Sequence, residues 1–90
     1  MDRLVVRRES YFDSVYLMSI SAELSEFDGV QEGQVVLANP ANIQLLEAQG
    51  FDLSSLGKLG VTDLVLALRA ETTDVLDAAE KHLDTLLARK

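Results

Sequence analysis

The side chains able to do acid–base or metal chemistry in this 90-residue chain are mostly carboxylates, with one histidine and no cysteine. The missing cysteines exclude thiolate metal sites, disulfides and cysteine nucleophiles. His82 falls at the edge of a predicted apolar helix stripe, where a lone histidine is far more often a boundary residue than a catalyst. The acidic clusters occupy the outer faces of predicted helices, where solvation explains them better than metal ligation: Glu23 and Glu26, then Asp77, Glu80 and Asp84.

Sequence motifs for catalysis or nucleotide binding are absent. The metalloprotease, nucleophile-elbow, Walker and dinucleotide-binding patterns do not occur. The glycines of segment 57–60 do not match a phosphate loop. We therefore expect no enzymatic activity from this chain alone, and no cofactor.

Composition narrows the partners and the location. The net charge is −7, from eight basic and fifteen acidic side chains, so nucleic acid and anionic membranes are poor partners. A hydrophobic content of 48% is typical of a folded globule. No apolar run approaches the roughly 20 residues that span a bilayer, and no signal peptide is apparent. These features predict a single cytoplasmic domain covering residues 1–90.

The element predicted most sharply is a short helix in segment 39–51, directly after the apolar strand 34–38. Asn39 is a good N-cap, and Pro40 falls at the first helical position, where its missing N–H costs nothing. Gly50 falls where a helix exits through a left-handed residue.

The chain reads as β-α-β-α-β-α, with these further elements: a strand at 3–9, a helix from a Ser10–Asp13 capping box to about Ser25, a loop at 52–62, a strand at 63–69 and a helix capped by Thr73. We favour an α+β fold of the ferredoxin-like split β-α-β type, with the third strand antiparallel between the first two and the two long helices on one face. The alternative is a small three-stranded parallel α/β sandwich.

The first predicted helix has two apolar sides. Leu17, Ile20 and Leu24 form one stripe at 100° per residue, and Val15, Met18 and Ala22 lie nearly opposite. A helix with two stripes contacts other segments on both sides, unless Met18 and Ala22 are simply tolerated at the surface.

The third strand is apolar on both faces. The leucines at 64, 66 and 68 should meet the helices, which would leave Val65 and Ala67 exposed together with Val5. Soluble monomers seldom expose such a patch. We therefore predict a protein interface: a homodimer formed by stacking open sheet faces or by joining sheet edges, or docking of this face on a larger protein body. The residues assigned to this interface are Val5, Arg7, Val65, Ala67 and Met18. The alternative is that the middle helix and the loop 52–62 cover this face.

A second candidate site is the turn that opens the middle helix. Free amides at a helix N-terminus suit a carboxylate or phosphate, although Asn39 can satisfy part of that demand itself. The residues assigned to this candidate anion or ligand turn are Asn39, Ala41, Asn42 and Arg69.

Several segments together resemble a known family: Tyr-Phe-Asp-Ser-Val-Tyr-Leu-Met at 11–18, Ile-Ser-Ala-Glu-Leu-Ser at 20–25, Asn42, Leu45-Leu46, Gly50-Phe51, Asp63-Leu64 and Arg69-Ala70. This chain is similar, over nearly its whole length, to the N-terminal domain of the FdrA family of acyl-CoA synthetase-like proteins.

The resemblance implies a function as part of a larger enzyme. The larger members of the family resemble the α subunit of succinyl-CoA synthetase, and they are associated with carbamoyl or acyl transfer in ureide and purine breakdown. The resemblance therefore implies an accessory interaction or assembly domain, and it carries no catalytic residue onto this chain. The alternative is a ferredoxin-like regulatory domain that binds a small anionic metabolite.

Overall fold

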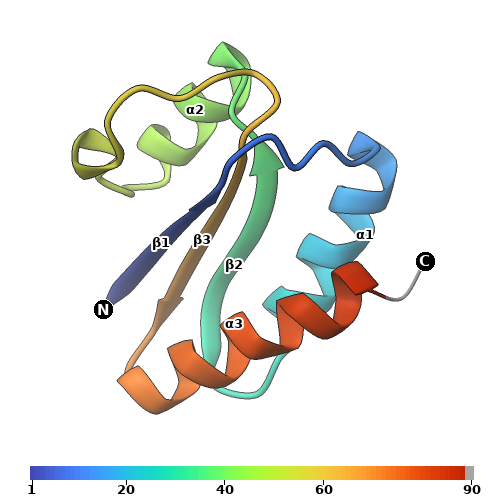
Figure 1. Ribbon diagram of the computed structural model, residues 1–90. Coiled ribbons are helices and arrows are strands. Elements are labelled where there is room, and N and C mark those ends of the chain that lie inside the picture. The colour runs from blue at the N-terminus through green and yellow to red at the C-terminus, as the bar shows by residue number, and fades with distance from the viewer. Residues whose placement is uncertain (89–90) are drawn as a thin grey trace.

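The computed structural model describes residues 1–88 as one sheet with helices on both sides (Figure 1). The elements are β1 Asp2–Arg7, α1 Ser14–Ser25, β2 Val30–Leu37, α2 Pro40–Ala48, a short 3-10 helix Ser54–Leu56, β3 Leu64–Ala70 and α3 Thr73–Ala88. No helix within residues 1–88 is long and apolar enough to cross a membrane.

The last strand lies in the middle of the sheet. The strand order is β1-β3-β2, and β3 runs antiparallel to both neighbours, with Leu66 opposite Val5 on one side and Val35 on the other. The predicted ferredoxin-like α+β arrangement is confirmed, and the parallel sandwich is wrong. β3 can take the central place because its side chains are apolar on both faces, and all of them except Arg69 are buried.

One face of the sheet is covered by the two long helices, α1 and α3 (Figure 1). Leu64, Leu66 and Leu68 point to this side, as predicted. The buried core between the sheet and these helices consists of Leu17, Ile20, Leu24, Val35, Leu64, Leu66, Leu68, Ala70, Leu76, Ala79, Leu83 and Leu86.

The opposite face is also covered, which corrects the prediction of an open apolar patch. Val65 and Ala67 are both 0% exposed. They pack in a second cluster with Leu46 of α2 and with Phe51 and Leu53 of the segment that follows it. α2 is short, but the chain beyond it turns back over the sheet and supplies the missing apolar cover.

Both ends of α2 form as the sequence predicts. The Asn39 side-chain oxygen accepts a hydrogen bond from the Asn42 N–H at 2.8 Å, and Pro40 occupies the first turn. Gly50 exits the helix with φ of +94°, and the Phe51 N–H donates to the Leu46 carbonyl at 3.1 Å.

The starts of the other two helices differ from the prediction. Asp13, and not Ser10, caps α1, because its carboxylate accepts the Val15 N–H at 2.7 Å. The chain before it is not helical: it forms a turn at Arg8 and Glu9, and Glu9 has a left-handed φ of +51°. At α3 the hydroxyl that accepts a first-turn amide belongs to Thr72, one residue before the predicted cap.

Candidate docking surface

The residues predicted to form an interface do not share one surface. Val65 and Ala67 are buried beneath α2. Val5 lies on the other face, because residues directly opposite in an antiparallel pair share a face and Val5 is paired with Leu66. It packs against the core under α1 and α3.

The two other predicted interface residues also separate. Arg7 points to the helix side and forms an ion pair with Asp84 of α3. Met18 is 71% exposed on α1. Only Met18 is therefore available to a partner in the way that the sequence predicts.

The residues of the predicted anion turn do not lie together either. Asn39 and Asn42 lie where β2 leads into α2, and they use their polar groups locally: the Asn42 side-chain amide donates to the Leu37 carbonyl at 2.8 Å. Arg69 lies near the far end of β3, because Leu37 is paired with Leu64 at its start. The prediction fails because side chains near opposite ends of a strand cannot converge on one small ligand.

Arg69 has partners of its own. Its guanidinium donates to the Asp2 carboxylate at 2.8 Å and to the Gln49 carbonyl at 3.2 Å, and it lies 4.5 Å from the centre of the Phe51 ring. The hydrogen bond from Arg69 lowers the pKa of Asp2. This arrangement ties the end of α2 to the sheet.

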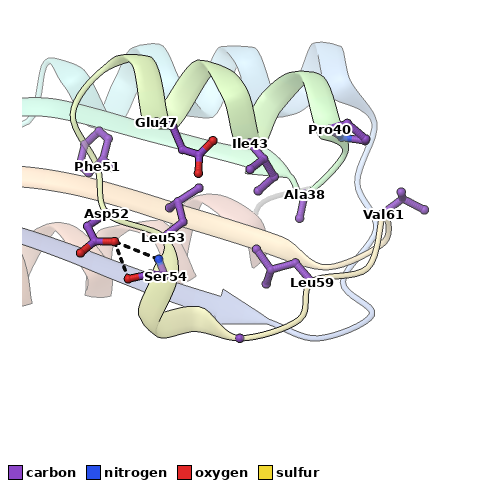
Figure 2. Close-up of a pocket in the computed structure, with 11 residues that line it drawn as sticks. Ala38, Pro40, Ile43, Glu47, Phe51, Asp52, Leu53, Ser54, Leu59 and Val61 are labelled. Atoms are coloured by element: carbon purple, nitrogen blue, oxygen red, sulfur yellow. Dashed lines mark hydrogen bonds between the residues drawn. The ribbon is translucent and has the colours of Figure 1, made fainter.

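A hollow of about 630 Å³ lies between α2 and the segment that follows it (Figure 2). Figure 2 shows Ile43, Leu53 and Leu59 lining its apolar interior, with the carboxylates of Glu47 and Asp52 nearby. Asp52 accepts hydrogen bonds from the hydroxyl and the N–H of Ser54, which lower its pKa. With carboxylates and no cation among its lining residues, this hollow is unsuited to an anion.

A second hollow, of about 520 Å³, is a groove that runs between α1 and α2 along β2. Met18 and Ala22 line it from α1, and Leu45, which is 47% exposed, lines it from α2. Val15 is 72% exposed on the adjoining surface of α1. Met18 and Ala22, from the second apolar stripe that the sequence predicts on α1, thus form a solvent-facing wall of this groove.

Serine side chains form the polar floor of the groove. The Ser21 hydroxyl accepts the Val35 N–H at 2.9 Å and lies 3.2 Å from the Val35 carbonyl, and the Ser25 hydroxyl donates to the Gly33 carbonyl at 2.8 Å. Sequence reasoning missed these contacts. The signal was the spacing of four residues between the serines, which places both on one side of the helix.

Asp63 joins three separate partners through its side chain. Its buried carboxylate accepts hydrogen bonds from the Gly60 N–H at 2.9 Å, the Glu9 N–H at 3.0 Å and the Arg8 guanidinium at 2.8 Å. These hydrogen bonds lower its pKa to about 2. The carboxylate is therefore a fixed anion that holds the β1–α1 loop against the loop before β3, and it is unsuited to proton transfer near neutral pH.

Comparison with known proteins shows the family to which this chain is similar. The family described as "AllF, heavy metal-associated domain" matches residues 1–90. Over 70 residues the chain is 31% identical to the uncharacterized protein YahF of Escherichia coli (strain K12), and this match covers 78% of the chain but only 14% of YahF. No solved structure matches.

The residues of this chain do not fit the heavy-metal ion that the family description names. The sequence contains no cysteine, so the soft thiolate ligands that such ions favour are missing. The ring of its one histidine, His82, lies against Phe27 with centroids 5.1 Å apart. Within residues 1–88 no group of histidine and carboxylate side chains is placed to hold a metal.

Proposed function

Because this chain belongs to the family of AllF heavy metal-associated domains, we propose that it is a non-catalytic interaction domain of a larger protein. The proposed parent is an FdrA-like acyl-CoA synthetase or carbamoyltransferase of ureide and purine breakdown, acting in the cytoplasm. The occupant of the groove between α1 and α2 is then the body of that enzyme. The small share of YahF that this chain matches supports a role as one part of a longer protein.

The observation that carries the proposal is the exposed apolar wall of the groove. Val15 and Met18 are nearly three-quarters exposed although the domain has two well-filled apolar clusters in which to bury such side chains. Leu45 faces the same groove from α2. Exposed apolar side chains gathered at one groove are typical of a surface that a protein partner covers.

The chemistry of the carboxylates supports a non-catalytic role. Asp63 is fully engaged in holding two loops together, and Asp77 and Asp84 are paired with arginines of β1. Within residues 1–88 these groups serve the fold, and the ring of the single histidine, His82, packs against Phe27.

The regulatory alternative has less support. No basic side chain lines either apolar hollow within the described residues. A small anionic metabolite would therefore meet an acidic or neutral surface at both places, which gives it no charge partner.

The test is calorimetric titration of the chain into the parent enzyme lacking its own copy of this domain. We expect saturable binding, and Met18→Asp should weaken it by about tenfold or more because a carboxylate would be buried against apolar side chains. The matched control is Ser19→Asp, which places the same charge on α1 at an exposed residue that does not line the groove. Absence of binding by the wild-type chain, or equal weakening by both variants, would contradict the proposal.

A further inference from the structure

The two edges of the sheet differ in whether their backbone groups are satisfied. On the outer edge of β2, Ser21 occupies both polar groups of Val35, while Ser25 binds the Gly33 carbonyl. The Asn42 side chain binds the Leu37 carbonyl. Side chains of α1 and α2 thus occupy the positions at which another strand would pair with β2.

The outer edge of β1 has no such cover. Backbone groups alternate in direction along an antiparallel strand. Leu66 of β3 is paired with Val35 on one side and with Val5 on the other. The N–H and C=O groups of Val35 point away from β3, toward Ser21. The N–H and C=O groups of Leu66 therefore point toward Val5. Leu4 and Val6 therefore direct their N–H and C=O groups outward. Within residues 1–88 no side chain hydrogen-bonds to them.

The same alternation between backbone groups that face β3 and backbone groups that face outward is seen at the start of β1. The Ala70 N–H donates to the Met1 carbonyl at 3.0 Å, so position 1 faces β3 as positions 3, 5 and 7 do. The outward-facing set consists of positions 2, 4 and 6.

The surface beside this edge is electrically balanced, which is unusual for this chain. α3 lines β1 with three carboxylates, Asp77, Glu80 and Asp84, and Arg3, Arg7 and Lys81 lie among them. Three negative and three positive charges leave a local sum of zero, whereas the whole chain carries −7. Two copies of a strongly acidic protein repel least where their facing surfaces are neutral.

We propose that β1 pairs antiparallel with β1 of a second copy of this chain, about a twofold axis, so that two three-stranded sheets become one. The proposed pairing uses the edge of the sheet away from the groove and does not depend on the proposed function. The favoured register places Leu4 opposite the partner's Leu4. The register centred on Val5 would place Arg3 directly opposite the partner's Arg7, and like charges so placed are destabilising.

Proline substitution tests the pairing directly. Proline is tolerated on an edge strand where its missing N–H faces solvent, so Leu4→Pro should fold, as judged by far-UV circular dichroism, but should not pair. Leu4→Ala is the matched control, because it removes the same side chain and keeps the N–H. By sedimentation equilibrium we expect dimers for wild type, Leu4→Ala and the groove variant Met18→Asp, and a monomer for Leu4→Pro. A monomeric wild type, or a dimeric Leu4→Pro, overturns the proposal.

Cross-linking tests the register and remains informative if Leu4→Pro fails to fold. The chain has no cysteine, so any disulfide in a single-cysteine variant joins two copies. In the favoured register the Leu4 Cα atoms lie about 5.5 Å apart, within disulfide range. Those of Val6 are offset by four residues, or roughly 13 Å. Leu4→Cys should therefore cross-link on mild oxidation and Val6→Cys should not. Equal cross-linking, or none, contradicts the register and the pairing.

Discussion

Asp63 shows how one carboxylate can join segments that are distant in the sequence. Its oxygens accept hydrogen bonds from Arg8 and Glu9, just after β1, and from Gly60, before β3. A carboxylate that accepts several hydrogen bonds prefers its charged form, which is why its pKa falls to about 2. The charged form is thus the one that stabilises the fold.

The direction of the pH dependence follows from that pKa. Asp63 has a folded-state pKa below the ordinary 3.8, so its stabilisation is complete above about pH 4 and is lost as the pH falls toward about 2. We predict that Asp63→Asn lowers the urea midpoint at pH 7 and that the gap from wild type narrows from pH 4 to pH 2. Asp28→Asn, in the exposed turn before β2, is the control and should leave the urea midpoint at pH 7 unchanged. A gap that stays constant with pH would refute this linkage.

Sequence reasoning could not find the Asp63 site. It recognised Asp63 only as the start of a strand, and it placed Arg8 at the end of another. Their contact depends on β1 pairing with β3 across more than fifty residues, and no local spacing encodes that. Arg69 was missed as a structural residue for the same reason, since Asp2 lies at the other end of the chain.

For the helices and strands, prediction from the sequence succeeded where the contacts that determine an element are made between residues close together in the chain. α2 was predicted at both ends because Asn39 and Gly50 act on neighbouring residues. The start of α1 was misplaced because Ser10 and Asp13 are both competent caps, and the local sequence does not distinguish them. The face on which Val5 lies was misassigned because strand register is a non-local property.

A substitution at Gly50 tests how much the backbone conformation at the end of α2 contributes to stability. With φ of +94° it has a conformation that side chains with a Cβ rarely adopt, and a β-branched residue is especially disfavoured there. We predict that Gly50→Val lowers the free energy of unfolding by about 1–2 kcal/mol or more, measured by urea denaturation. Gly60→Ala is the control, because a Cβ there meets the Asp63 carboxylate only at an ordinary 3.6 Å. An unchanged midpoint for Gly50→Val would show that this helix exit is unstrained.

For the whole molecule, the family description and the side chains lead to opposite expectations about metal. The description names a heavy metal, yet the chain lacks thiols and its histidine is packed on Phe27. We predict that equimolar zinc or copper(I) leaves the thermal midpoint unchanged and that neither ion is retained after gel filtration, as measured by mass spectrometry. Retention of one metal ion per chain would show that the donor set has been misjudged.

The position of β3 also governs the order in which the molecule can form during synthesis. β1 and β2 emerge from the ribosome first, yet neither pairs with the other, because the strand that separates them is made last. The sheet therefore cannot begin until the chain has been extended into β3, which starts at Leu64, and every strand pairing must then close a long loop. Until that moment the apolar segments that become the core have no sheet to join, and this delay leaves the nascent chain exposed to chaperones and to aggregation.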